Sequence, residues 1–505
     1  DLHLVDYDGD NWWVLYRYGA SVWTITAEID STPYVEVDNN PKIVWVNSDS
    51  NASLSAVNNI NKPYTNLELA IAEVPVSATT SATLDEIIGS TGYFSWSLLP
   101  NIYTVHVIGD SVYLTDAQIT SIGDTKNFKL VLDAGLRIED GGNLGAIFND
   151  IVNISGNGYI YQKNTTITDS LFTPSNNTPV IDINLDAVYY KSTSQILFGI
   201  YYTGVAFNLV DSGANTNINL NRLFLNTATG FALPSASNQG TNISVNSIQI
   251  SNANIFHNLL TLPKSSIDSP TPGRKYTNVN FGTVGSYMNG FARLLTSDED
   301  TLYGNQDLDI HIDQVNFVNV SFPFIDVRGG DFTNSKINID IDTFNIYGPY
   351  IQLNSETPFN GQLNFNVNKE THLTSTGTNQ IILTMGGGNT ISGKVKITGE
   401  QHGCLVFGGT DTVVDNLYLE GNYVTTSTYE TFIYAQSTTG VQDHKIYLNN
   451  CKIIGETDWS LVARSGIVEV GTLTLICSNV HTNMMGALPA WVTVVGDLTQ
   501  NVDYK

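Results

Sequence analysis

Polar and apolar residues alternate in short segments spread along the chain. Between 308 and 313 the aliphatic residues Leu308, Ile310 and Ile312 alternate with two acids and a histidine, and the segment 337–342 repeats this pattern. Successive side chains of a β-strand point to opposite faces. Each segment therefore predicts a strand with one buried face and one polar face.

These segments recur along the chain at intervals that are too long for hairpins. The ten clearest ones begin at positions 218, 243, 279, 310, 339, 365, 395, 417, 446 and 473. Nine steps span 255 residues, or about 28 per step, which fits one coil of a parallel β-helix. We predict an all-β chain that forms a right-handed, single-stranded parallel β-helix of about ten or more coils. A sandwich or a propeller is the alternative, although a four-stranded blade needs roughly 40 to 45 residues.

The pattern changes at both ends of this repeat. Residues 1–40 are strand-rich and predict a small N-terminal β segment that serves as a connector. Residues 41–110 contain a first strand and, at 66–73, a segment with helical spacing that predicts a helix capping the first coil. The β-helix itself is expected over 111–470. We assign 471–505 to a terminal coil and a C-terminal cap, in which the strands after Trp491 leave the repeat.

The segment 41–75 also carries a resemblance. A strand, a turn rich in Ser, Asp and Asn, a Lys-Pro-Tyr-Thr sequence and a helix follow one another, and a first full rung comes after them. The matching residues are Val44, Trp45, Val46, Asp49, Lys62, Pro63, Tyr64, Thr65, Leu67 and Ala70, with 103–109 and 112–114 as the rung. This arrangement resembles the beginning of pectate-lyase-like right-handed β-helix proteins, most of all bacteriophage tail spikes and tail fibres. The lyase catalytic pattern of a Ca²⁺ site with an adjacent arginine is not carried over.

Composition excludes several classes of function. The 505 residues include 22 Lys and Arg against 48 Asp and Glu, a net charge of −26, and no basic stripe offsets it, so we expect no nucleic-acid partner. No apolar stretch is long enough to predict membrane insertion. Cys404, Cys451 and Cys477 show no metal-binding spacing and are expected to be free buried thiols. Because the chain starts at Asp1 without a signal-type segment, we expect it to be a portion of a longer protein.

The best candidate for chemistry is a group of acids on the polar face of the repeat. If Ile310 aligns with Ile339 on adjacent rungs, Asp313 lies near Asp342 and His311 lies near Asp340. Paired carboxyl groups can act as general acid and base on a glycosidic bond, so these three acids are the candidate catalytic residues. The competing interpretations are a solvated acidic face and a charged ladder at a subunit contact.

Aromatic residues are the candidates for binding a glycan. His311, Tyr347 and Tyr350 are the candidate glycan-binding residues, because aromatic rings pack against the C–H faces of sugars. The acids Asp326 and Asp331 flank Gly329-Gly330 and are assigned to an ordinary loop. No metal site and no cofactor are predicted.

Three functions fit these observations. The first is a phage tail spike or tail fibre, a homotrimer in the virion or outside the cell, which binds bacterial surface polysaccharide and contacts other tail proteins through its N-terminus. The second is a polysaccharide depolymerase, either a hydrolase or a lyase, on the same fold. The third is a bacterial surface adhesin. The sequence leaves open whether the protein is an enzyme and leans against it.

Overall fold

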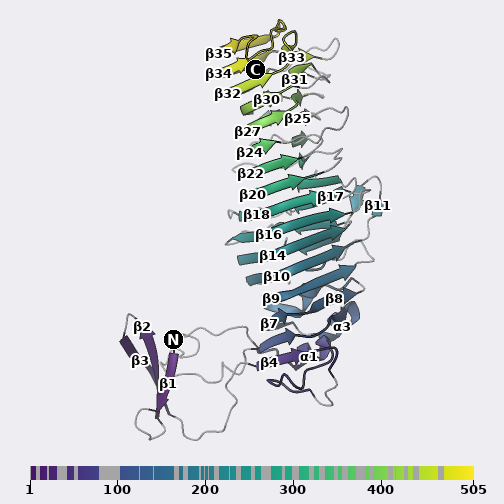
Figure 1. Ribbon diagram of the computed structural model, residues 1–505, viewed down its shortest axis with the longest axis vertical. Coiled ribbons are helices and arrows are strands. Elements are labelled where there is room, and N and C mark those ends of the chain that lie inside the picture. The colour runs from purple at the N-terminus through teal and green to yellow at the C-terminus, as the bar shows by residue number, and fades with distance from the viewer. Residues whose placement is uncertain are drawn as a thin grey trace.

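The fold is described from a computed structural model. It describes residues 2–6, 12–19, 22–30, 42–50, 55–78, 103–123, 125–139, 141–163, 170–174, 180–192, 195–197, 200–202, 204–209, 215–226, 228–234, 240–251, 256–262, 275–286, 291–297, 306–317, 324–328, 336–345, 351–354, 362–370, 381–386, 390–392, 394–407, 413–415, 417–425, 430–435, 443–464 and 471–504. Figure 1 shows the strands stacked as rungs along one long axis, from β4 and α1 at one end to β35 at the other.

Most strands belong to one long sheet in which neighbouring rungs pair in parallel. Its strands are β4 (Lys42–Val46), β5 (Tyr103–Val107), β6 (Val112–Thr115), β7 (Lys126–Leu132), β8 (Gly135–Glu139), β9 (Phe148–Lys163), β10 (Val180–Lys191), β14 (Asn215–Asn226), β16 (Thr241–Ser251), β18 (Lys275–Ser286), β20 (Gln306–Asn316), β22 (Lys336–Asn345), β24 (Gln362–Glu370), β27 (Lys394–His402), β30 (Leu417–Val424), β32 (His444–Ile454), β34 (Leu473–Thr482) and β35 (Val492–Gln500).

A second parallel sheet of ten strands completes the coils. It contains β13 (Gly204–Asn208), β15 (Ala228–Ala232), β17 (Phe256–Thr261), β19 (Phe291–Thr296), β21 (Ile325–Arg328), β23 (Ile351–Asn354), β25 (Ile381–Gly386), β28 (Cys404–Phe407), β31 (Thr431–Ala435) and β33 (Ser460–Arg464). Because strands far apart along the chain stack in parallel in both sheets, the chain is a right-handed parallel β-helix, as the repeat predicted.

Smaller elements lie outside these two sheets. Strands β26 (Thr390–Ser392) and β29 (Val413–Asp415) pair in parallel, whereas β11 (Gln195–Leu197) and β12 (Ile200–Tyr202) are antiparallel. A short 3₁₀ helix, η2, spans Leu144–Ile147. In the N-terminal segment, β1 (Leu2–Asp6), β2 (Trp12–Gly19) and β3 (Val22–Asp30) form a three-stranded antiparallel sheet.

Long strands such as β10 turn a corner of the coil. In its pairing with β14, Asp186 and Asn221 are the one position that is not paired. The alternation of buried and outward residues shifts by one residue at this point, so the buried residues are Ile183 and Leu185 before the corner and Val188 after it. Both halves of the strand thus bury one side. We call the outward side before the corner the first face and the outward side after it the second face.

The interior is a continuous apolar core. Aliphatic and aromatic residues of successive rungs stack in register, as Ile218, Ile243 and Val279 do. In the second sheet the stacked rings of Phe207 and Phe231 have centroids 5.0 Å apart. This stacking replaces the single globular core of an ordinary domain, since each rung buries its apolar face against its neighbours.

The predicted capping helix is confirmed. Helix α1 spans Leu67–Glu73 and is capped by Asn66, whose side chain accepts a hydrogen bond from the backbone N–H of Glu68 at 2.7 Å. At the C-terminal end of the helix, the backbone carbonyl groups have no partner within the helix. The Lys126 ammonium group donates hydrogen bonds to two of them, the carbonyl oxygens of Ile71 and Ala72, at 2.9 and 3.2 Å. Leu67 and Ile71 are buried against the first coil.

A second helix was not predicted. Helix α3 spans Asp116–Ile122, directly after β6, and Thr115 and Gln118 form a reciprocal capping box at its start. The Thr-x-x-Gln spacing is a recognised signal for a helix N-terminus and was present in the sequence. Among the described residues, no helix is long and apolar enough to cross a membrane.

Two details of the predicted repeat are wrong. Phe365 pairs with Ile397 and Ile446 pairs with Leu475, so the registers that began at 395 and 473 were two residues early. A slip of two residues keeps the same side chains inside, which is why the faces were still assigned correctly. The strand after Trp491 does not leave the repeat, because β35 pairs in parallel with β34 and forms a further rung.

Two groups of polar side chains lie inside the coil. Cys404, Cys451 and Cys477 are free and buried, as predicted, and burial raises the pKa of the Cys404 and Cys451 thiols to about 12.

Asp326 was expected in a loop, but it lies in β21, is fully buried and pairs with the Arg293 guanidinium at 2.9 Å. The loop assignment of Asp326 is therefore wrong.

We expect the stability of the protein to fall in acid because of His444. This side chain is 2% exposed, and burial lowers its pKa to about 4, against about 6.5 in an unfolded chain. Between these two values the unfolded state binds a proton that the folded state excludes, so folding weakens by up to about 3 kcal/mol as the pH falls from 6.5 to 4.

Denaturant unfolding at pH 7, 5.5 and 4.5 measures this effect. In a His444→Gln variant the acid-linked loss should shrink, while the effect of other titrating groups stays. If wild type and variant lose the same free energy of unfolding over this range, the pKa of His444 is not displaced.

Candidate functional site

The predicted acid cluster is assembled at the edge of the first face, with His311 and Asp340 on that face and Asp313 and Asp342 at the corner. Ile310 pairs with Ile339, so His311 lies directly beside Asp340 on the next rung. The Nδ1 atom of His311 is 3.6 Å from Oδ2 of Asp340, and its Nε2 atom is 3.3 Å from Oδ1 of Asp313 and 4.0 Å from Oδ2 of Asp342. The register and the alternation together bring these four side chains to one place, as predicted from the sequence.

This cluster is open to solvent. Its side chains are 41% exposed for His311, 48% for Asp340, 50% for Asp342 and 67% for Asp313. His311, Asp340 and Asp342 each place one ligand atom within 4.8 Å of the others, a spacing that a divalent cation can bridge. Chemically the group can exchange protons with a bound sugar or hold a cation, and both roles need a ligand to be brought to an exposed surface.

The structure describes one of the three predicted glycan-binding residues. His311 belongs to the acid cluster, whereas Tyr347 and Tyr350 lie outside the described residues. Their assignment stays a prediction.

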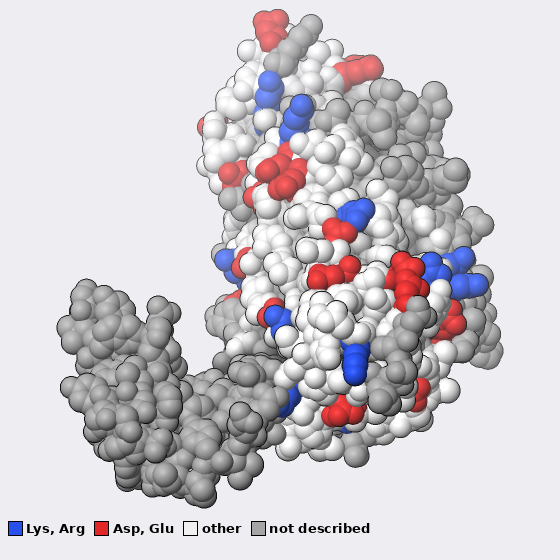
Figure 2. Space-filling model, turned by 60° about the horizontal axis from the view of Figure 1, so that its bottom comes forward, with Lys and Arg blue, Asp and Glu red and all other residues white. Residues whose placement is uncertain are grey.

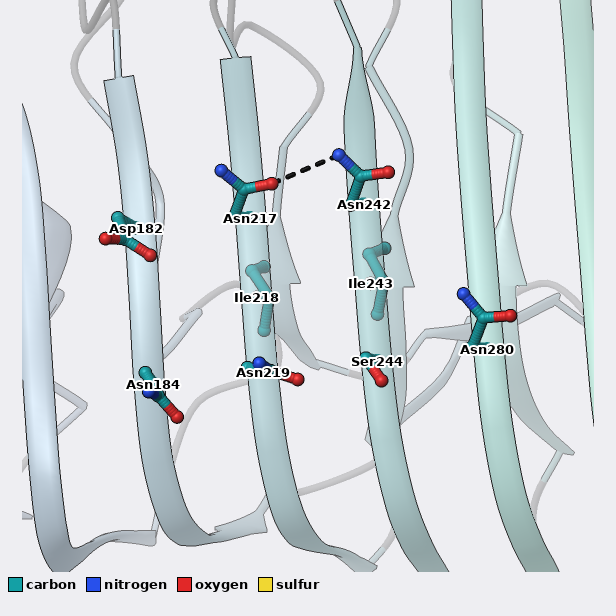
Figure 3. Close-up of a pocket in the computed structure, with 9 residues that line it drawn as sticks. All are labelled: Asp182, Asn184, Asn217, Ile218, Asn219, Asn242, Ile243, Ser244 and Asn280. Carbon is teal, nitrogen blue, oxygen red and sulfur yellow. Dashed lines mark hydrogen bonds between the residues drawn. The ribbon is translucent and has the colours of Figure 1, made fainter. Parts of the chain in front are cut away.

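A shallow hollow of about 250 Å³ lies on the same first face, nearer the first coil. Figure 3 shows that its polar side chains stand in two rows across β10, β14, β16 and β18. Pairing in register produces the rows, because Asn184, Asn219, Ser244 and Asn280 occupy equivalent positions on four successive rungs. We call this feature the asparagine hollow, lined by Asp182, Asn184, Asn217, Ile218, Asn219, Asn242, Ile243, Ser244 and Asn280.

The two rows differ in their hydrogen bonds. In one row Asn242 donates to the side-chain oxygen of Asn217 at 3.1 Å, the dashed line in Figure 3. In the other row the amides of Asn184, Asn219 and Asn280 make no hydrogen bond to any part of the chain that the structure describes. Each of these amides keeps two donors and an acceptor for a ligand.

Charge is sparse on the surface around the first coils. Figure 2 views the molecule from this end and shows scattered Lys, Arg, Asp and Glu on a mainly uncharged surface. Such a surface recognises ligands through hydrogen bonds and ring contacts more than through a strong electric field.

The asparagine hollow was not predicted from the sequence. The sequence pattern that indicates it is the recurrence of Asn at alternate positions of consecutive strands, as in Asn184 and Asn219. That pattern was used there only to assign the outward face, because the register that brings the rows together was not known.

Comparison with known proteins gives no relative. No protein-family model matches the chain, and neither a curated protein nor a solved structure matches it significantly.

Proposed function

We propose that this protein is a tail-spike or tail-fibre protein of a bacteriophage, located in the virion, whose β-helix attaches to polysaccharide on the host surface. The resemblance of the segment 41–75 to such proteins supports the assignment. A stack of coils with one continuous core also suits a rod that has to stay rigid when it meets a cell surface.

The asparagine hollow is the observation that carries this proposal. A polysaccharide presents many hydroxyl groups, each both a donor and an acceptor, and side-chain amides match both roles. The rungs repeat about every 4.8 Å, so the free amides of Asn184, Asn219 and Asn280 form a regular row along which a chain of sugars could bind.

A glycan-binding assay tests the proposal. Purified protein is measured against a panel of bacterial surface polysaccharides, together with the double variant Asn219→Ala/Asn280→Ala. We expect one or more polysaccharides to bind, and the double variant to bind them at least tenfold more weakly because it loses two amide contacts, about 1 kcal/mol or more each in a bound state.

The matched control is Asn338→Ala, which removes an amide from the same face but outside the hollow, where Asn338 bonds to Asp309 and Asn364. This variant should bind as wild type does. A protein that binds no polysaccharide of the panel, or a double variant that binds as tightly as wild type, would contradict the proposal.

The proposed oligomer is a homotrimer of rods side by side, with the N-terminal sheet contacting other tail proteins. Support comes from apolar side chains exposed near the C-terminal end, where Val495 is 50% and Met485 is 47% exposed and Tyr418 stacks on Tyr447 at 4.3 Å. Subunit contacts would cover such residues. Mass measurement in solution, with and without mild SDS, should give three times the mass of the chain.

The acid cluster favours a second candidate function, a polysaccharide depolymerase. It brings Asp313, Asp340 and Asp342 around His311, as glycosidic-bond cleavage requires of paired acids. If the protein releases reducing ends from a polysaccharide, Asp313→Asn and Asp342→Asn should abolish the release without changing stability. The control Asp309→Asn, on the same strand as Asp313, should leave the release unchanged. Full activity in both cluster variants would rule this site out.

A further inference from the structure

A column of aromatic and basic side chains runs over the second face of the first coils. Register pairing joins Tyr113 of β6 to Arg137 of β8, then to Tyr161 of β9, Tyr189 of β10 and Phe224 of β14. We call these five residues the Arg137 column. It occupies five successive rungs, and none of its members points into the core.

Arg137 lies between two tyrosine rings. Its guanidinium carbon is 5.7 Å from the ring centroid of Tyr113 and 5.7 Å from that of Tyr161. These tyrosines are 49% and 37% exposed, so the cation and the two rings form a surface open to solvent. Cation–π contact on both sides orients the guanidinium group, and a side-chain hydrogen bond with Tyr159 raises its pKa. The five N–H donors of a guanidinium group leave further donors for a ligand.

The column continues into a stack of rings on the next two rungs. The rings of Tyr189 and Phe224 are 4.4 Å apart and nearly parallel, and Tyr159 meets Tyr189 edge-on at 5.9 Å. Tyr159 in turn shares a hydrogen bond with Ser111 at 2.9 Å. Each ring is held by its neighbours, so the surface is ordered before any ligand arrives.

The local charge is the opposite of that of the whole chain. Acids outnumber bases by 48 to 22, yet Arg137 has no carboxylate partner among the residues that the structure describes. Exposed Lys163 and Lys191 pair in register two positions further along β9 and β10, and neither has a carboxylate partner within the described ranges. Of the acids on these strands, Asp150 and Asp182 lie before the corner, and Asp186 at the corner is already paired with Arg222. Glu139 is the one acid after the corner, and it follows the last β8–β9 register pair in line with Lys163.

Three unpaired cations beside exposed rings match one kind of ligand. Flat C–H faces of sugar rings pack on tyrosine rings, while a guanidinium group forms two parallel hydrogen bonds to a carboxylate or a phosphate. A neutral glycan would use the rings and leave the cations unmatched. An anionic glycan uses both.

We propose that the Arg137 column is a binding site for an anionic polysaccharide, with Arg137, Lys163 and Lys191 pairing its acidic groups and the tyrosine rings packing against its sugars. This inference rests on the proposed function, and it specifies the charge of the glycan. The column and the asparagine hollow share β10 and β14, with Asn184 before the corner and Tyr189 after it. One glycan chain can therefore pass around the corner from one to the other.

The experiment compares each acidic polysaccharide of the surface panel with its carboxyl-reduced and its dephosphorylated form. Wild type, Arg137→Met and the control Lys445→Met are measured against all of them. Methionine keeps the packing of the arginine stem and removes the charge, whereas Lys445 is an exposed cation far away on β32. The treatment that abolishes binding identifies the anion as carboxylate or phosphate.

We expect Arg137→Met to bind the acidic polysaccharide at least tenfold more weakly, and Lys445→Met to match wild type. Added salt should weaken binding by wild type more than by Arg137→Met, because one ion pair is lost in the variant. Tyr113→Ala, which truncates a half-exposed ring, provides a second variant and should also weaken binding.

Three results are distinguishable. Loss of affinity in both column variants and on removal of the anion supports the inference. Binding that tolerates these variants and the neutralised glycans overturns the Arg137 column but leaves the proposed function standing. A protein that binds no polysaccharide of the panel overturns the proposed function, and the inference with it.

Discussion

Replacing Asp326 with alanine is expected to lower the free energy of unfolding by about 3–5 kcal/mol, one of the two largest effects that the structure predicts. The carboxylate is fully buried in β21 and lies 2.9 Å from the Arg293 guanidinium of β19, whose side chain is only 13% exposed. Removing the acid leaves a positive charge inside the coil without its counter-charge. The guanidinium stays largely desolvated after it has lost this carboxylate, which accounts for the size of the loss.

Two further variants separate charge from packing. The double variant Asp326→Leu/Arg293→Met removes both charges and should be more stable than Asp326→Ala, because no buried charge is left over. Arg222→Met breaks the exposed pair with Asp186, whose side chains are 46% and 29% exposed, and should cost less than about 1 kcal/mol. Denaturant unfolding measures the free energy of unfolding of wild type and of these three variants. If Asp326→Ala and Arg222→Met lose the same free energy of unfolding, the burial of the Asp326 pair does not determine its contribution to stability.

The second large effect is expected at Gly156, where Gly156→Ala should destabilise the protein by about 3 kcal/mol or more. This glycine has a φ of +130°, a backbone conformation that residues with a Cβ rarely adopt, and a Cβ placed there would lie 2.1 Å from the carbonyl oxygen of Leu132 on the rung below. The backbone of either β7 or β9 has to shift to make room.

Ser155→Ala is the matched control for this position. Ser155 is the preceding residue of β9, on the outward side, and its substitution removes only a hydroxyl group. It should change the free energy of unfolding by less than about 0.5 kcal/mol. If Gly156→Ala unfolds at the same denaturant concentration as Ser155→Ala, the close approach between β9 and β7 does not constrain the coil.

Local patterns in the sequence were enough to predict much of the fold. Alternation gave the buried and outward sides of β20 and β22, and a common interval between strands predicted the stacked coils. Helix α1 followed from the spacing of Leu67, Ala70 and Ile71 after a capping residue. These features depend on residues close together in sequence, or on one repeated interval, and both can be read without a structure.

The candidate sites show where this kind of reasoning fails. The acid cluster was found because β20 and β22 have identical alternation, so that aligning Ile310 with Ile339 fixed every neighbour. The Arg137 column was missed although Tyr113, Arg137 and Tyr161 are spaced by 24 and again by 24 residues. Loops of variable length separate the later rungs, and only the pairing register reveals which side chains stack across them.

Asp326 was misassigned for a related reason. The Gly329-Gly330 pair beside it is a strong turn signal, and an acid next to such a turn is usually solvated. Its partner Arg293 lies 33 residues earlier, on another rung, so nothing local indicated a buried pair.

The most direct test of attachment through this part of the β-helix is a crystal structure with bound oligosaccharide, taken from a surface polysaccharide that the protein binds. The account predicts sugar rings over the free amides of Asn184, Asn219 and Asn280, with an acidic group of the glycan beside Arg137. Oligosaccharide bound only elsewhere, for example at His311 and its acids, would contradict it.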